Sequence, residues 1–393
     1  MMKIAALVVL AACHDASVAP PPLSPERVAA NAPALEALRG AKFTDAVKLA
    51  GDQLAAAPRD SEAAAIRGLA AYVTAADQFV VDTDVGHSWF IVDALVDEHA
   101  HAALETFIAQ VDRVDRDLAI AAADPHFSLE LCIACWEYDW NHRGEIDDRD
   151  RKLLEVEVDA QGKELPEGDP RRRPTFHFDV GDVFWARAML AFQRAALDVV
   201  LAYRWNDAKH GDAIVIPLVA PDRVKQAKVL LLAGLDFADQ ARRSYLQETD
   251  DDREWLPNPR QANHGIPLDV DDKLYATWAD VIGDVRRLVR GDEGLSLHDV
   301  AELVEPRAAL LMPDAYIDVS AMLSQPTDIK LDADGKLDDR ATIEKALRGV
   351  LGHGFVEHMK ASPLVKRLAD LAMARGRGEH ELARKLRYLI WLN

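Results

Sequence analysis

The sequence predicts a mainly α-helical protein built from several packed helical regions. Of its 393 residues, 49% are hydrophobic; many recur at helical spacing, and strand-like alternation is scarce. Its 20 glycines and 19 prolines are spread along the chain, which leaves long stretches free to form helices. A body of this length exceeds one ordinary core, so we expect two or three helical subdomains.

The first residues have the features of an export signal. Lys3 precedes a short apolar run, residues 4–10, whereas a membrane-spanning helix needs about 20 apolar residues. The sequence Leu10-Ala11-Ala12-Cys13 resembles the lipobox of a bacterial lipoprotein. The resemblance implies removal of residues 1–12 and lipidation of Cys13 in the cell envelope; the alternative is an ordinary signal peptide. His14, where Asp would mark inner-membrane retention in enteric bacteria, favours the outer membrane, facing the periplasm or the cell surface.

Residues 13–33 are rich in Ala, Pro and Ser, which cannot build a core, so we expect a tether. No second long apolar run follows in the sequence, and the lipid would be the only membrane attachment. The formal net charge of −20 argues against nucleic acid, whose phosphates need a basic surface. The same charge argues against a body that lies on an anionic membrane.

The body is divided into three expected regions, 34–125, 126–247 and 248–393. The first contains a partial resemblance to a tetratricopeptide repeat, within residues 34–75. Phe43, Ala46, Leu54 and Pro58 have the spacing of the second helix and closing proline of one unit, and Gly68 has the place of a small residue in the next unit. An ordinary Ala-rich helical hairpin explains the same residues equally well.

Residues 139–150 have the composition of a cation-binding loop. Gly144 allows a sharp bend in the middle of the loop, and side chains that carry oxygen surround it. The pattern resembles the calcium loop of an EF-hand, which implies flanking helices over 127–138 and 148–155 and a Ca²⁺ ion. The implied ligands are Asp139, Asn141, Glu145, Asp147 and Asp150. Arg143 and the final Asp150 depart from the pattern and predict weak binding; the alternative is a metal-free connection between helices.

Cys132 and Cys135 lie three residues apart just ahead of this loop. In an oxidising compartment we expect a local disulfide or two buried thiols. A redox pair similar to that of thioredoxin is a third reading. In that family a Trp precedes the first cysteine, whereas here Trp136 follows the second.

The remaining chain alternates expected helices with short irregular segments. Residues 156–165 and 329–338 each contain an Asp-Ala-X-Gly turn and predict small β-hairpins. A central core helix is expected over 180–205, capped by Asp179 or Asp182. Further helices are expected from 90 to 123 and over 222–247, 273–290, 296–303 (capped by Ser296), 342–360 and 362–388. Residues 255–267, with three prolines, are expected to form an irregular surface rim.

Signatures of enzymes are mostly absent: the sequence has no Gly-X-Ser-X-Gly elbow, phosphate loop or dinucleotide fingerprint. We therefore expect an envelope-anchored, calcium-binding helical lipoprotein that serves as a binding or scaffold protein for a protein or envelope polymer, with a structural calcium ion. The alternative is an extracytoplasmic hydrolase that uses a metal or a carboxylate pair between helical subdomains. An open groove along the amino-terminal helices would favour the first class, and a pocket that gathers acids from distant positions would favour the second.

Overall fold

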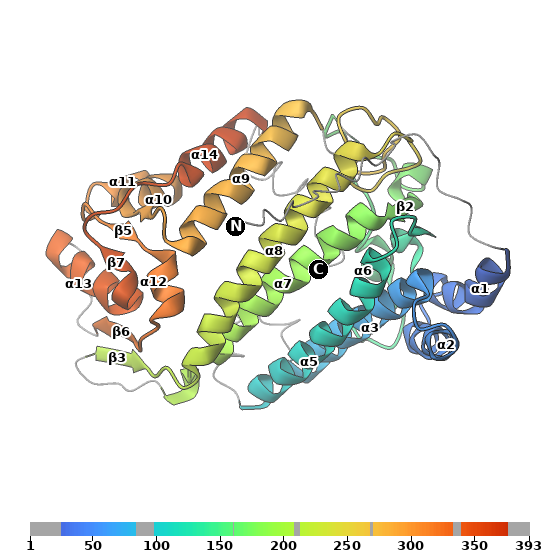
Figure 1. Cartoon of the computed structure of the whole chain (residues 1–393), viewed down its shortest axis with the longest axis horizontal. Coiled ribbons are helices and arrows are strands. Elements are labelled where there is room, and N and C mark those ends of the chain that lie inside the picture. Colours follow the sequence, from blue (N-terminus) through green and yellow to red (C-terminus); the bar gives the residue numbers. More distant parts are fainter. Residues whose placement is uncertain are drawn as a thin grey trace, which may run out of the picture.

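Long helices packed side by side form the body of the protein (Figure 1). The computed structural model describes residues 25–83, 98–159, 161–207, 213–267, 270–332 and 339–375. This part is mainly helical with a few small antiparallel strand pairs, which confirms the predicted fold class. The expected signal peptide, residues 1–12, together with Cys13 and residues 14–24 of the expected tether, lies outside the described residues.

The amino-terminal helices are α1 (Pro25–Arg39), α2 (Phe43–Ala56) and α3 (Ser61–Thr83). The α2–α3 hairpin buries the predicted Phe43, Ala46 and Leu54. Helix α1 begins inside the segment expected to be a tether, so that expectation is wrong from Pro25 onward. Pro25 suits the first turn of a helix, where its missing N–H group is not needed. Asn31 ties this helix to the rest of the protein, because it is fully buried and its side-chain amide donates to Asp60.

The central helices are α5 (Glu98–Ala122), α7 (Val180–Leu201), α8 (Pro221–Gln247) and α9 (Asp272–Arg290). Together with α3 they form a row in which each helix packs on the next: α3 on α5, α5 on α7, α7 on α8 and α8 on α9 (Figure 1). These four helices confirm the predictions made for their regions; residues 84–97, which include the expected start of the first, lie outside the described chain. Both predicted caps of α7 operate, because Asp179 and Asp182 form a reciprocal capping box.

The helix expected over 127–138 is wrong. Its place is taken by β1 (Ser128–Leu131), which pairs antiparallel with β2 (Phe176–Asp179), and by a 3₁₀ turn, η2 (Ile133–Cys135). Phe127, Leu129, Leu131 and Ile133 are all buried, which is the two-residue period of a strand. The same apolar residues also contain a helical spacing, and the pairing partner decided between the two periods.

The first predicted hairpin forms in minimal form, with one antiparallel bridge between Val158 and Glu164 and a turn at Gly162, whose φ is +79°. The second does not close on itself within the described residues. Its first half is β6 (Ile329–Asp332), which pairs antiparallel with the distant β3 (Ala213–Ile216), and residues 333–338 lie outside the described chain.

The carboxyl-terminal part contains short helices around a three-stranded sheet. The helices are α10 (Leu297–Val304), α11 (Pro306–Ala309), α12 (Val319–Ser324), α13 (Arg340–Leu351) and α14 (Leu364–Arg375). The strands are β4 (Leu295–Ser296), β5 (Tyr316–Ile317) and β7 (Phe355–Val356), and further 3₁₀ turns are η3 (Pro170–Arg172), η4 (Trp205–Asp207) and η5 (Gly352–Gly354). Ser296 caps α10 as predicted.

The helix predicted over 342–360 ends early, at Leu351. Gly352 adopts a φ of +53°, which a helix cannot continue, and a Cβ there would lie 2.3 Å from the Thr327 hydroxyl. The chain then enters η5 and β7. The last predicted helix is observed from Leu364 to Arg375, and its remainder lies outside the described chain.

The largest buried cluster joins the amino-terminal helices, the β1–β2 pair and the segment that follows α8. Trp255 in that segment and Tyr245 near the end of α8 are among the largest fully buried side chains. Among the helices of the described residues, none has both the length and the apolarity that crossing a membrane requires. The main core therefore extends from the amino-terminal helices through the β1–β2 pair to residues of α7 and α8.

Candidate metal centre

The predicted calcium loop is a tight turn held by its own hydrogen bonds. The Asp139 carboxylate accepts the backbone N–H groups of Arg143, at 3.1 Å, and Gly144, at 2.7 Å. Gly144 has a φ of +85°, as its place in the loop predicted. Asp150, which is buried, accepts the side-chain amide of Asn141 at 2.8 Å and the backbone N–H of Asp147 at 2.9 Å.

Asp147 serves as the amino-terminal cap of the short helix α6 (Asp148–Lys152), in a capping box with Asp150. Glu145 is exposed, and Oδ1 of Asn141 is buried and receives no hydrogen bond from the described residues. The loop is described completely, and no three of its carboxylates bring ligand atoms within 4.8 Å of one another. The expected ligands are therefore used mainly as local caps.

Contacts with helix α3 hold this loop in place. The Tyr138 hydroxyl donates to Asp77 at 2.7 Å, and Nε2 of His142 lies 3.0 Å from the same carboxylate. Burial, with the Asp77 hydrogen bond, raises the pKa of Tyr138. Trp140 packs on Tyr138, with ring centroids 4.8 Å apart. These contacts hold the loop against α3.

A different group of carboxylates converges where α7 begins and α8 ends. Asp179, Glu248 and Glu254 each offer one oxygen atom, and these atoms all lie within 4.8 Å of one another. Asp179 caps α7, Glu248 follows the last residue of α8, and Glu254 lies in the next loop. Because α7 and α8 run antiparallel, the start of one and the end of the other meet at the same end of the helix pair (Figure 1).

The loop after α8 is anchored by amide side chains. Nδ2 of Asn258 donates to the Tyr245 carbonyl at 2.8 Å, and Nε2 of Gln261 donates to the Glu248 carboxylate at 3.3 Å. Glu254 is bridged by backbone pairing to both His177 and His264. Residues 255–258 are buried, so the expectation of a surface rim is wrong for this half of the segment. This part of the segment is buried because its apolar side chains pack in the core and its side-chain amides form hydrogen bonds with backbone groups.

The three carboxylates have few donors. Oδ1 of Asp179 accepts from the backbone of Gly181 and Asp182, and Glu254 accepts from the backbone of Asp252 at 3.3 Å. Oε1 of Glu248 is buried and receives no hydrogen bond from the described residues. Within that part of the chain, no Lys or Arg forms an ion pair with any of the three, although buried carboxylates usually need one.

A fourth carboxyl group, that of Asp182, interacts with Asp179 and Glu254 of the centre. Asp182 is 4% exposed and accepts a hydrogen bond from the Tyr245 hydroxyl at 2.8 Å. The close approach of α8 depends on Gly181, because a Cβ at that position would lie 2.7 Å from the Tyr245 ring. Asp182 also borders a largely apolar cavity of about 70 Å³ whose walls include Tyr72, Phe178 and Trp255.

The carboxyl groups of the centre hold protons unusually strongly. Burial raises the pKa of Glu248 to about 11, and the neighbouring Asp179 adds to the shift. Burial and Asp179 likewise raise the pKa of Glu254 to about 7. Burial raises the pKa of Asp182 well above its usual range, against the hydrogen bonds from Asp179 and Tyr245. Near neutral pH, bound protons or a bound cation must balance this accumulation of acids.

The donor set suits a hard divalent cation. Ca²⁺ and Mg²⁺ prefer carboxylate oxygens, whereas structural zinc sites use Cys and His. The exposed Asp250, Asp251 and Asp252 border the centre and would attract cations to it. A second acidic group, His298, Asp299 and Glu302, lies on the exposed face of α10, where water solvates all three side chains.

Sequence reasoning located parts of this centre without joining them. Asp179 and Asp182 were identified as candidate caps, but Glu248 and Glu254 were not identified as site residues. The sequence signal that could have indicated the centre has two parts: two acids at the start of one long helix, and an acidic run at the end of the next. That signal becomes a site only if the two helices are antiparallel neighbours.

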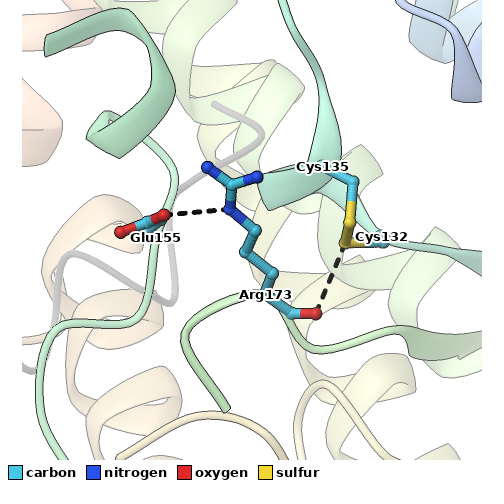
Figure 2. Close-up of a disulfide and its surroundings, with 4 residues drawn as sticks. All are labelled: Cys132, Cys135, Glu155 and Arg173. Carbon is cyan, nitrogen blue, oxygen red and sulfur yellow. Dashed lines mark hydrogen bonds and ion pairs between the residues drawn. A yellow bond between two sulfur atoms is a disulfide. The ribbon is translucent and has the colours of Figure 1, made fainter. Parts of the chain in front are cut away.

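The structure joins Cys132 and Cys135 in a disulfide near the end of β1 (Figure 2).

Comparisons of the chain with protein-family models, with curated proteins and with solved structures give no match.

Proposed function

We propose that this protein is an envelope-anchored helical lipoprotein that binds one hard divalent cation, Ca²⁺ in the envelope, at Asp179, Glu248 and Glu254. The observation that carries the proposal is the convergence of three carboxylate oxygens within 4.8 Å, with Oε1 of Glu248 buried and without a hydrogen-bond donor from the described residues. Two carboxylates that face each other in a partly buried site repel unless a proton or a cation lies between them. Water would complete the six or more ligands that Ca²⁺ requires.

The arrangement supports a structural role for the ion. Its ligands belong to the β2–α7 junction, the end of α8 and the following loop, so one ion would link three segments. Extracellular calcium modules bind with dissociation constants of about 0.1–1 mM, which is sufficient where calcium is nearly constant. We expect the bound protein to be more rigid at this junction and to unfold at a higher temperature.

The amino-terminal helices support the binding or scaffold part of the proposal. A hollow of about 280 Å³ lies among α2, α3 and α5. Its lining combines hydrogen-bonding and aromatic side chains, among them Thr44, Thr74, Gln78, Phe79, Phe107 and Gln110. Such a surface suits a protein segment or an envelope polymer better than a small ion, because it offers apolar area with dispersed polar groups.

Calorimetric titration of CaCl₂ into the metal-stripped protein tests the proposal. The parent protein should bind one ion, and the double variant Asp179→Asn with Glu254→Gln should bind at least about tenfold more weakly, because two charged ligands become neutral. Asp222→Asn with Glu302→Gln is the matched control, since it removes the same charge from exposed side chains on other parts of the protein. Equal affinity of the parent and the first variant would exclude the centre, and MgCl₂ titrations would define the preferred ion.

A hydrolase that uses carboxylates is the second candidate. The gathering of acids from distant positions favours it, as does the pKa of Glu254, about 7, which suits a general acid or base. Chromogenic ester, peptide and glycoside substrates would test this candidate with the parent protein and Glu254→Gln. Turnover that is lost in Glu254→Gln without loss of calcium affinity would support the hydrolase.

A further inference from the structure

The disulfide between Cys132 and Cys135 is accessible from one side. Cys135 is exposed and Cys132 is half-buried. Figure 2 shows the Cys132 sulfur directed at the Arg173 carbonyl oxygen, 3.5 Å away, while the Arg173 guanidinium turns to Glu155, at 2.9 Å. The two sulfurs thus differ: Cys135 is open to attack, and Cys132 has a hydrogen-bond acceptor ready for its thiol.

A basic hollow of about 370 Å³ lies over the disulfide. It is lined by Arg39, Glu130, Cys132, Cys135, Thr175 and Arg253. Arg39 donates to the Glu130 carbonyl at 3.0 Å, and Arg253 forms an ion pair with the Glu130 carboxylate. Two arginines and one glutamate leave one net positive charge in this hollow, on a chain whose formal net charge is −20. A positively charged hollow in an acidic protein favours the binding of an anionic ligand.

A disulfide between residues three apart closes a very short loop. Disulfides stabilise folds by restricting the unfolded chain, and the shortest loops restrict it least. The neighbouring segment is also fastened by other means, because β1 pairs along its length with β2. Loss of this bond should leave the fold intact, which is a requirement for reversible exchange.

We propose that Cys132 and Cys135 form a thiol–disulfide exchange site that takes a small anionic thiol in the hollow of Arg39 and Arg253. The incoming thiolate attacks Cys135 Sγ and forms a mixed disulfide, while the bond to Cys132 breaks and its electron pair leaves on Cys132 Sγ. That sulfur takes up a proton and donates it in a hydrogen bond to the Arg173 carbonyl. A second thiolate attacks the sulfur of the first, releases Cys135 as a thiolate and yields the oxidised thiol pair.

Electrons balance in this sequence: two small thiols lose two electrons, and the cysteine pair gains two. The negative charge that is shared among three sulfurs during attack lies beside Arg39 and Arg253, which stabilise it. An anionic group elsewhere on the thiol adds to the attraction. The site therefore discriminates among small thiols by their charge rather than by their shape.

Reduction rates with three matched thiols test the proposal: 2-mercaptoethanesulfonate, 2-mercaptoethanol and cysteamine. The protein carries Cys13→Ser, which leaves Cys132 and Cys135 as the only cysteines of the chain. Released protein thiols are alkylated and counted by mass, and each rate is divided by the thiolate concentration. At low salt the anionic thiol should react about fivefold faster than the cationic one, and the ratio should approach one at high salt.

Variants assign the effect to the hollow. Arg39→Gln and Arg253→Gln should each lower the ratio about twofold, whereas Arg243→Gln, an exposed arginine on α8, should leave it unchanged. Two single-cysteine variants are then treated with the disulfide formed by two molecules of 2-mercaptoethanesulfonate. Cys135, the remaining cysteine in Cys132→Ser, should form a stable mixed disulfide faster than Cys132 does in Cys135→Ser. Equal ratios for all three arginine variants, a preference for cysteamine, or reduction only after unfolding would overturn the proposal.

Discussion

The Tyr245 hydroxyl donates to the Asp182 carboxylate across the α7–α8 interface, at 2.8 Å. Both side chains are almost completely buried, and Asp182 also accepts the backbone N–H of Asp179, a member of the candidate metal centre. Burial raises the pKa of both groups well above their usual ranges. This contact joins the end of α8 to the start of α7, so it should support both the stability of the helix pair and the geometry of the centre.

Removal of this hydroxyl tests how much the contact contributes. Tyr245→Phe should lower the free energy of unfolding by about 1–3 kcal/mol, because a buried carboxyl group loses a donor. Denaturant unfolding of the calcium-free protein measures the change. Tyr72→Phe is the control, since its hydroxyl lies farther from its partner atoms, 3.4 Å from Oε1 and 3.2 Å from Nε2 of the neutral Gln193. Equal losses of unfolding free energy in the two variants would show that the hydrogen bond to Asp182 contributes no more than the contacts of Tyr72 with Gln193.

Gly181 permits the close approach of Tyr245 to the start of α7. In Gly181→Ala the new Cβ would lie 2.7 Å from the ring, so α8 or the ring must shift and the variant should lose about 1–3 kcal/mol. Gly51→Ala on α2 is the matched control, because its Cβ would meet only the Arg67 side chain, at 3.9 Å. That variant should gain about 0.5–1 kcal/mol from helix propensity. Thermal unfolding measures both, and a Gly181→Ala protein as stable as the parent would contradict the packing argument.

The stability of the calcium-free protein should fall as the pH rises from 5 to 8. The folded protein raises the pKa of Glu254 from 4.5 to about 7 and that of Glu248 from 4.5 to about 11, so it holds protons that the unfolded chain releases. This contribution is complete below about pH 4.5 and is lost as the pH rises through the folded values. Asp239 and Glu293, whose pKa values are lowered, lose their contribution only in acid.

Melting temperatures in a chelating buffer at pH 5, 6, 7 and 8 measure this trend. Saturating CaCl₂ at pH 8 should restore the lost stability, because the cation replaces the protons. Glu254→Gln should flatten the profile between pH 5 and 7. A melting temperature that rises over this range in the parent protein would show that the acids of the centre do not control its stability.

The loop at residues 139–150 offers a competing location for calcium. Asp150→Ala should lower the free energy of unfolding by about 1–3 kcal/mol, because the buried Asp150 accepts from Asn141 and from the backbone of Asp147. Its calcium affinity should equal that of the parent, since the proposed ion lies at the other centre. Calorimetry of Asp139→Ala with Asp150→Ala is the measurement. A loss of calcium affinity in this double variant would place the ion in the loop.

The candidate centre shows how far prediction from sequence could go. The caps of α7 were predicted from local chemistry, because a side-chain oxygen placed before an apolar helical run bonds the free N–H groups of the first turn. Glu248 and Glu254 were missed, because their meeting with Asp179 depends on which helix lies beside α7 and in which direction it runs. No local pattern contains that information.

The sequence by itself determined the helical class, the bounds of α7, α8 and α9 within a few residues, and the caps at Asp179 and Ser296. These follow from periodicity and from hydrogen bonds within one turn, which need only neighbouring residues. Only the tertiary structure decided that residues 128–131 form a strand and that Asp179, Glu248 and Glu254 converge. A strand needs a partner and a site needs several segments, so both depend on contacts between residues far apart in the chain.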